Sequence, residues 1–225
     1  MFNKKHFDKN MRQTDKEIFD MRRNYINKPI REIDMKGNPF EQFSLWFDES
    51  LSIETAEANA MVLSTCGKDN RPSSRVVLLK KFDEKGFTFF TNYESHKGED
   101  ILFNPNVALL FFWEKSMRQV RIEGIAEKTT AEESDEYFYS RPAESRITAA
   151  YSKQSKELRS KDIFKQKLDN IFNSGAYVKR PDNWGGYRVQ PLLFEFWQGG
   201  PGRLHDRFEY KRGDDLLWTF KRLYP

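Results

Sequence analysis

One short segment of the sequence, residues 197–212 (WQGGPGRLHDRFEYKR), combines glycines, aromatic rings and several basic side chains. Within it, Arg203, His205 and Arg207 occupy alternate positions after a glycine-rich turn. Alternate residues of a regular strand point to the same face, so we expect these three side chains to form one wall of a site for a flat, anionic ligand. The alternative is a hairpin at the surface, in which the charges are solvated.

A second candidate is the segment RVVLLK, in which Arg75 and Lys80 bracket an apolar run. Residues five apart in a strand point to opposite faces. We therefore expect the two cations to serve two different sites or two parts of one ligand. The alternative is that both are strand-end charges that reach out into water.

A third candidate, EYFYSRPAES, spaces Tyr137, Arg141 and Ser145 four residues apart. On a continuous helix this spacing puts them on nearly one face, although Pro142 interrupts the helix. A phenol, a guanidinium and a hydroxyl that converge would clamp a phosphate. A solvated surface helix is the alternative.

The segment SHKG offers a hydroxyl, an imidazole and an ammonium at the start of a predicted helix. Free backbone N–H groups and the helix dipole favour an anion there, unless Ser95 serves only as a cap. Gln119, Gln154 and Ser155 are polar but carry no signal of their own. Together these segments indicate two phosphate sites and a planar ligand.

Composition limits the other classes of function. The chain has 225 residues and a net charge of +4, from 38 basic and 34 acidic residues, which gives little support to nucleic-acid binding. Cys66 is the only cysteine and no two histidines stand at metal-ligand spacing, so we expect no disulfide and no metal. The N-terminus lacks an apolar signal region, and no run approaches the roughly 20 apolar residues that span a bilayer. We expect a cytoplasmic protein that does not enter membranes.

The elements that must position these residues are mostly short strands. Alternation and turn residues predict strands at 60–66, 73–82, 86–92, 107–113 and 117–128, followed by GGYRVQP, LLFEFWQ, RFEYKR and LLWTFKR. Helices are predicted from the Asn38 cap onward, from Ser95 to Asn104, from Thr130 to about Ser140, and over 160–173. Strands joined by turns, with few helices between them, favour a mainly β (α+β) fold, an antiparallel barrel with flanking helices. Residues 1–20 are expected to be a flexible tail with a short helical piece, and residues 21–225 a single domain.

Several segments, taken in order, carry a family resemblance: RRNY, RVVLLK, FFTN followed by SHKG, RQVRIEG, YFYSRP, SKQS, WGGYRV and FWQGGPGRLHDRFEY. From about residue 20 to 225 the chain resembles the pyridoxine/pyridoxamine 5′-phosphate oxidases, which are flavin enzymes. The resemblance implies a split β-barrel that binds FMN at a homodimer interface. It also implies oxidation of pyridoxine or pyridoxamine 5′-phosphate to pyridoxal 5′-phosphate by O2, with release of H2O2 and, from the amine, ammonia. This reaction belongs to vitamin B6 synthesis and salvage.

The resemblance also assigns residues to the two ligands. For FMN it implies Arg75, Val76, Val77, Leu78, Leu79, Lys80, Phe90, Thr91, His96, Lys97, Gln119, Gln154, Ser155, Trp197 and Arg207. For the substrate it implies Arg22, Arg23, Tyr25, Lys80, Tyr137, Arg141, Ser145, Arg203, Leu204 and His205, with Arg203 and His205 as the catalytic pair over the pyridine ring.

Two positions depart from the family pattern. His96 stands where the family commonly has arginine, and because an unperturbed imidazole is mostly neutral at pH 7, we expect a weaker hold on the FMN phosphate. Asn24 replaces the usual acid of the N-terminal motif, which changes the contacts of the segment that can close over the site. Two other functions are weighed against the oxidase: a non-catalytic flavin-binding split barrel, and a nucleic-acid-binding barrel. The second phosphate clamp argues against the former.

Overall fold

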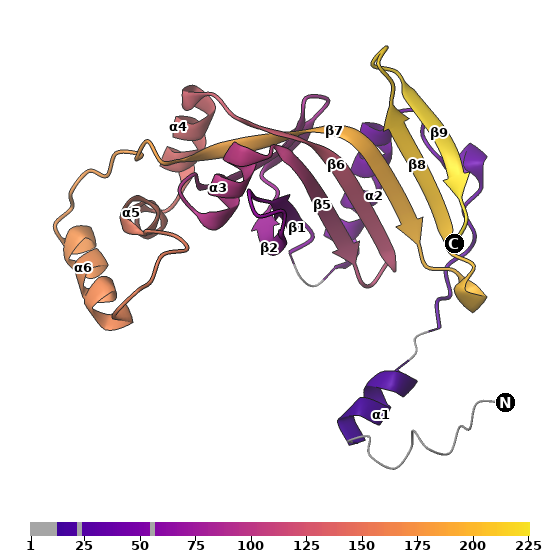
Figure 1. Cartoon of the computed structure of the whole chain (residues 1–225), viewed down its shortest axis with the longest axis horizontal. Coiled ribbons are helices and arrows are strands. Elements are labelled where there is room, and N and C mark those ends of the chain that lie inside the picture. The colour runs from indigo at the N-terminus through magenta and orange to yellow at the C-terminus, as the bar shows by residue number, and fades with distance from the viewer. Residues whose placement is uncertain (1–12, 22–23, 55–56) are drawn as a thin grey trace.

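The computed structural model describes residues 13–21, 24–54 and 57–225, so Arg22 and Arg23 lie outside the described residues. Within this part of the chain, nine strands form one antiparallel sheet in the order β2-β1-β5-β6-β7-β4-β3, with β8 paired to β7 and β9 paired to β8 (Figure 1). Their bounds are β1 Ala60–Cys66, β2 Pro72–Leu78, β3 Lys81–Asp83, β4 Gly86–Asn92, β5 Asn106–Trp113, β6 Arg118–Lys128, β7 Trp184–Gln198, β8 Asp206–Arg212 and β9 Trp218–Leu223.

The helices flank this sheet, and several begin at caps that the sequence predicts. They are α1 Gln13–Asp20, α2 Pro39–Ile53, α3 His96–Phe103, α4 Ala131–Ser140, α5 Ala143–Tyr151 and α6 Lys161–Asn173, with short 3-10 turns at Glu32–Asp34 and Pro201–Arg203. Asn38 caps α2, Ser95 caps α3, and Thr130 forms a capping box with Glu133 at the start of α4. No helix within the described ranges is both long enough and apolar enough to cross a membrane.

Strand β7 runs through the centre of the fold and links its two ends. Its first half pairs with β4 and its second half with β8, while β6 lies alongside most of its length. The sequence predicts two strands here, but the structure has one, because a β-bulge at Glu123/Gly124 lets the pairing continue past Pro191. In Figure 1, α4, α5 and α6 stand at one end of the sheet and β8 and β9 at the other.

The predicted strand 73–82 is also corrected by the structure. It breaks after Leu78, where the backbone N–H of Leu79 donates to Asn59 and that of Lys80 donates to the Thr88 carbonyl. The chain therefore leaves β1 and joins β4 within two residues, which turns the corner of a half-barrel. This corner places Arg75 before it and Lys80 directly after it.

Aromatic side chains fill the core between the sheet and α2. Phe43 of α2 is fully buried, and its ring lies 4.8 Å from Phe87 and 5.1 Å from Phe111, centroid to centroid. Trp46 packs edge-on against Phe196 at 5.3 Å. Burial of rings of this size dominates the packing free energy of a core, so the sheet forms a rigid base for the polar residues at its edge.

Candidate functional site

A cavity of about 740 Å³ lies beside β2 and β4, where α4 and α5 approach the sheet. Many of the residues singled out from the sequence line it: Arg75, Val76, Val77, Leu78, Lys80, Phe90, Thr91, Lys97, Tyr137, Arg141, Ser145 and Gln154. Six further lining residues were not predicted: Asn92, Pro142, Thr148, Ala149, Ser152 and Trp184. The lining contains four cations and no carboxylate, which is the composition of an anion-binding site.

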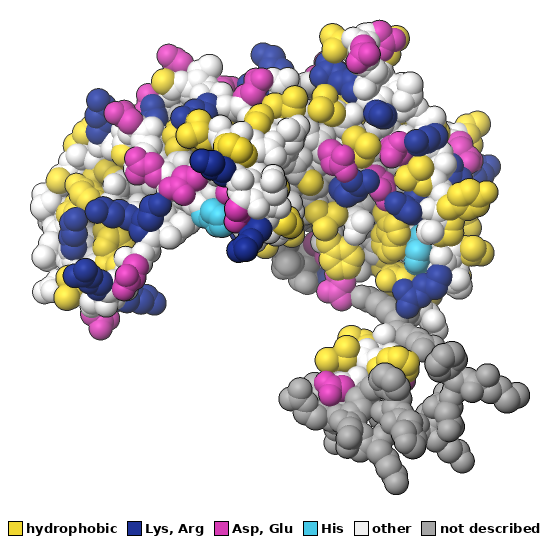
Figure 2. Space-filling model, in the orientation of Figure 1, with side chains coloured by type: hydrophobic (Ala, Val, Ile, Leu, Met, Phe, Trp, Pro, Cys, Tyr) yellow, Lys and Arg dark blue, Asp and Glu magenta, His cyan; other side chains and the backbone are white. Residues whose placement is uncertain are grey.

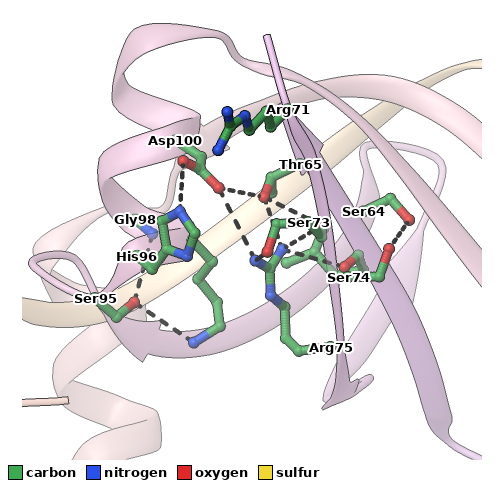
Figure 3. Close-up of polar contacts among 12 residues, drawn as sticks. Ser64, Thr65, Arg71, Ser73, Ser74, Arg75, Ser95, His96, Gly98 and Asp100 are labelled. Atoms are coloured by element: carbon green, nitrogen blue, oxygen red, sulfur yellow. Dashed lines mark hydrogen bonds and ion pairs between the residues drawn. The ribbon is translucent and has the colours of Figure 1, made fainter. Parts of the chain in front are cut away.

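The Arg75 guanidinium is held in place by residues near the end of β1 and the start of β2 (Figure 3). Its Nη1 donates to the Thr65 hydroxyl at 2.7 Å, to the Ser73 carbonyl at 3.0 Å and to the Leu63 carbonyl at 3.3 Å. Its Nη2 donates to the Ser73 hydroxyl at 2.7 Å. Burial lowers the pKa of Arg75, and nearby Asp100 opposes that shift. The guanidinium is thus held in one orientation and is poorly solvated, so its charge interacts strongly with an anion.

Lys97 supplies a second buried cation on the same side of the cavity. Its Nζ donates to Gln154 Oε1 at 2.9 Å and to Thr91 Oγ1 at 3.3 Å. Burial lowers the pKa of Lys97, and the positive charge of Arg75 lowers it further. Two cations that repel each other in a desolvated place favour an anion between or beside them.

Helix α3 begins next to these two cations. Ser95 caps it by accepting from the Gly98 N–H, and its own hydroxyl donates to the Asn92 carbonyl at 2.6 Å. Gly98 permits this close start, because a Cβ there would lie 2.1 Å from the Tyr93 carbonyl oxygen. His96, in contrast, is exposed and does not line the cavity; its Nε2 lies 3.5 Å from Asp100 Oδ1.

The predicted phosphate clamp comes from two helices rather than one. Helix α4 ends at Ser140, Arg141 is its C-cap, and α5 starts at Ala143 after Pro142. The kink keeps Tyr137, Arg141 and Ser145 on the cavity wall together with Lys80, whose Nζ lies 5.8 Å from the Tyr137 ring centroid. Arg75 and Lys80 therefore both line one cavity. That they contact two parts of one ligand stays a prediction.

Trp184 is the main lining residue that sequence reasoning missed. Its indole lies 5.0 Å below the Arg141 guanidinium and nearly parallel to Tyr137, with ring centroids 6.2 Å apart. Burial lowers the pKa of Arg141, and its Nη1 is buried without a hydrogen-bond partner among the residues that the structure describes. A tryptophan at the start of an apolar strand is typical of core. The following glycine is the only local signal of close packing, since a Cβ on Gly185 would fall 2.2 Å from Tyr93 Oη.

The other predicted residues form a second group, the β7–β8 cluster: Tyr25, Gln119, Trp197, Arg203, Leu204, His205 and Arg207. The His205 ring lies 5.4 Å from Tyr25 and 4.8 Å from Trp197, and Arg203 lies 5.9 Å from the Tyr25 ring. None of the seven lines the cavity. Figure 2 shows two separate histidine surfaces on one face, one over α3 and another beside the start of β8.

The expected regular strand through Arg203, His205 and Arg207 does not form. Strand β8 begins only at Asp206, and Arg203 ends a 3-10 turn with a left-handed φ of 67°. The Gly200 N–H donates to His205 Nδ1 at 3.2 Å, and burial followed by the charges of Arg203 and Arg207 lowers the pKa of His205. Both observations favour a neutral imidazole whose proton is on Nε2.

Two other members of the cluster, Arg207 and Gln119, and two further predicted residues, Leu79 and Ser155, also do not line the cavity. Arg207 donates from Nε to Glu195 at 2.9 Å and from Nη1 to the Tyr224 carbonyl at 3.0 Å. Gln119 stands opposite Trp197 in the β6–β7 ladder. The Leu79 side chain is buried in the hydrophobic core, and Ser155 is exposed with a φ of 68°. A direct contact of these four with a ligand stays a prediction.

The antiparallel half-barrel with its flanking helices places the chain in the class of split-barrel proteins. Two solved structures share this fold. PhzG from Burkholderia lata 383, in complex with tetrahydrophenazine-1-carboxylic acid, superposes with a TM-score of 0.84 at 27% identity, over 89% of this chain and 99% of that chain. A pyridoxamine 5′-phosphate oxidase-related, FMN binding protein from Nostoc punctiforme gives 0.68 at 15% identity, over 85% and 100%.

Sequence comparison defines the family within this class. Residues 47–175 match the family described as pyridoxamine 5′-phosphate oxidase, and residues 184–225 match the pyridoxine 5′-phosphate oxidase C-terminal dimerisation region. A pyridoxine/pyridoxamine 5′-phosphate oxidase of Cupriavidus metallidurans is 48% identical over 93% of this chain and 99% of its own length. A chloroplastic one of Arabidopsis thaliana is 47% identical over 93% of this chain and 41% of its own length. The chain belongs to the pyridoxamine 5′-phosphate oxidase family, as the resemblance predicts.

Proposed function

We propose that this protein is an FMN-dependent oxidase that converts pyridoxine or pyridoxamine 5′-phosphate to pyridoxal 5′-phosphate. O2 is the electron acceptor, and H2O2 is released, with ammonia from the amine. The names of relatives at 46–49% identity support the reaction. The observation that carries the proposal is the cavity itself, whose lining holds two pairs of cations, Arg75 with Lys97 and Lys80 with Arg141, and no acid.

The residues present fit a flavin phosphate at the first pair. Arg75 is fixed by four hydrogen bonds, and Lys97 by Thr91 and Gln154, so both charges are preorganised for an anion. Apolar side chains of the same lining, such as Val76, Leu78 and Phe90, suit a planar ring. FMN, when bound, would accept the hydride from the substrate and pass the electrons to O2.

The second pair fits the phosphate of the substrate. Arg141 carries a buried Nη1 with no partner, and a buried donor without an acceptor costs about 1–3 kcal/mol. A phosphate oxygen would satisfy it, while Lys80, Tyr137 and Ser145 supply further donors from the same wall. Fixing the phosphate would hold the pyridine ring in one orientation, and such positioning accounts for much of an enzyme's rate enhancement.

We propose further that the β7–β8 cluster completes the cavity of a second subunit. The cluster does not line the cavity of its own chain, and most of it falls within residues 184–225, which match a dimerisation region. A homodimer with two such shared sites, each with FMN at the subunit interface, would bring Arg203 and His205 over the substrate ring. Residues 21–225 would then act as one domain, since β7 joins both family segments in one sheet.

The geometry favours a positioning role for His205. Its Nδ1 already accepts from the Gly200 N–H, so the neutral ring offers an Nε2–H donor rather than a base. We assign His205 and Arg203 to the orientation of the pyridine ring and its substituents.

The test is direct. The purified protein is examined for a flavin spectrum and then given pyridoxine 5′-phosphate in air, with pyridoxal 5′-phosphate and H2O2 both measured. Equal amounts of aldehyde and peroxide are expected. A yellow protein that forms no product would support a non-catalytic flavin binder. A colourless protein with salt-sensitive affinity for nucleic acid would contradict the proposal altogether.

A further inference from the structure

A buried carboxylate stands directly behind the first pair of cations. Asp100 of α3 is 6% exposed, does not line the cavity, and faces the ends of β1 and β2 (Figure 3). Gly67 passes so close that a Cβ there would lie 2.4 Å from Asp100 Oδ1. A buried charge is costly unless it is compensated, and a negative charge near a phosphate site has the wrong sign for direct binding. Its contacts therefore call for a different role.

The contacts form a directed chain of hydrogen bonds. The Thr65 hydroxyl lies 2.7 Å from Asp100 Oδ2 and 3.5 Å from the Ser73 carbonyl. A carboxylate only accepts, and a hydroxyl has a single proton. The Thr65 proton therefore points to Asp100, and the lone pairs of Thr65 Oγ1 are left to accept from Arg75 Nη1 at 2.7 Å.

Loss of Asp100 would remove the acceptor of one hydrogen bond, the one that the Thr65 hydroxyl donates. Without the carboxylate, the Thr65 proton would turn to the next acceptor, the Ser73 carbonyl. That carbonyl already accepts from Arg75 Nη1 at 3.0 Å, so hydroxyl and guanidinium would compete for it. The direct contact of Asp100 with Arg75 is much longer, 3.9 Å to Nη2, which makes Thr65 the main route of its influence.

We propose that Asp100 is a positioning residue: it orients the Thr65 hydroxyl, which fixes the Arg75 guanidinium for the phosphate of a bound flavin nucleotide. The proposal rests on the proposed function, because it needs a flavin phosphate at Arg75. It assigns Asp100 no contact with flavin or substrate.

The experiment compares FMN with riboflavin, which lacks only the phosphate. The full-length protein, freed of flavin, is titrated with each, and dissociation constants are read from flavin fluorescence. The ratio of the riboflavin constant to the FMN constant measures what the phosphate contributes. The variants are Asp100→Ala, Asp100→Asn, Thr65→Val and the double variant Asp100→Ala/Thr65→Val. Ser64→Ala is the matched control, since it removes a hydroxyl on the same strand that bonds Ser74 and not Asp100.

The expected result is a pattern across these variants. Asp100→Ala lowers the ratio about ten-fold, the size of one charge-assisted hydrogen bond, while riboflavin affinity stays near wild type. Thr65→Val does the same, and the double variant is no worse than either single one, because both act through one chain of bonds. Asp100→Asn keeps most of the ratio, since an amide oxygen still accepts from Thr65. Ser64→Ala changes nothing.

Other patterns would overturn the proposal. If FMN and riboflavin affinities fall together in Asp100→Ala, the residue only supports the fold. If the ratio rises, repulsion between the carboxylate and the phosphate is the larger effect. A normal ratio in Thr65→Val would exclude the route through the hydroxyl. A wild-type protein that binds neither flavin would contradict the proposed function and this role with it.

Discussion

The cavity and the β7–β8 cluster both carry arginines, but the arginines of the two regions differ in their carboxylate partners. In the cavity, within the described part of the chain, Arg141 has a buried nitrogen with no partner, and no carboxylate belongs to the wall. Next to the cluster, Glu195 is 4% exposed and accepts from both Arg121 at 2.6 Å and Arg207 at 2.9 Å. This difference in pairing distinguishes a cation suited to bind an anionic ligand from cations that stabilise the fold.

Within the cluster, Arg203 is the exception, because it is exposed, lies 5.9 Å from the Tyr25 ring, and has no carboxylate partner among the described residues. An exposed cation of this kind, next to a histidine held neutral, is suited to contact something outside its own chain. The comparison thus separates Arg203 and His205, which would act on a ligand, from Arg207, whose charge is compensated by Glu195 of the same chain.

The largest expected effect follows from removing the unpaired cation of the cavity. Arg141→Ala should lower kcat/KM for pyridoxine 5′-phosphate by about 10²- to 10³-fold, because it deletes buried charge-assisted bonds to the phosphate. Bound flavin, read from the absorbance spectrum, should be unchanged. A loss of less than about three-fold would mean that Arg141 is not part of the substrate clamp.

Mixing two defective subunits tests whether the two regions meet across an interface. Arg141→Ala and His205→Ala homodimers should each be nearly inactive. After exchange in equal amounts, half of the dimers are hybrids, and each hybrid has one intact site of two. Activity should therefore recover to about a quarter of wild type. If both regions serve one site within a single chain, the mixture stays as inactive as its parents.

A smaller effect is expected from substituting Trp184, whose ring lies against the Arg141 guanidinium. Trp184→Leu removes the indole that lies 5.0 Å from the guanidinium, and a cation–π contact of this kind is worth roughly 0.5–2 kcal/mol. KM for the substrate should rise about five- to ten-fold with kcat nearly constant. Trp184→Phe, which keeps an aromatic face, should restore most of the affinity. Equal losses in both variants would point to packing instead.

The ion pairs of Glu195 with Arg121 and Arg207 should contribute to the free energy of unfolding. Burial raises the pKa of Glu195, but the hydrogen bonds and charges of the two arginines together outweigh burial and hold this pKa below its usual value of 4.5. A depressed pKa means that the stabilisation is fully present above about pH 5 and is lost as pH falls through the folded-state value. Glu195→Gln should therefore lower the free energy of unfolding by about 1–3 kcal/mol at pH 7.

The control for this prediction is Glu123→Gln, which breaks a more exposed contact with Arg121 and should cost less than about 1 kcal/mol. Urea unfolding at pH 7 and pH 4 measures both. The gap between wild type and Glu195→Gln should narrow at the lower pH. A constant gap would show that the carboxylate charge is not what stabilises this end of the sheet.

Many parts of the fold can be predicted because their causes are local. Asn38, Ser95 and Thr130 start helices by accepting backbone N–H bonds two or three residues away. The strand breaks were harder to predict. Nothing in VVLLKK marks the corner at Leu79, since Asn59 and Thr88, which bond Leu79 and Lys80 there, come from other segments. The sequence also predicts a strand through Arg203, because alternation of residue types does not reveal a left-handed φ.

By itself the sequence determined which side chains are candidates for two phosphate sites, the family to which the chain belongs, and most helix starts. Only the tertiary structure decided that Arg75 and Lys80 reach one cavity, that Trp184 lies under Arg141, and that Asp100 stands behind Arg75. The physical reason is the range of the interactions. Caps and turns act within a few residues, whereas Thr65 and Asp100 are 35 positions apart and meet only when α3 packs on β1.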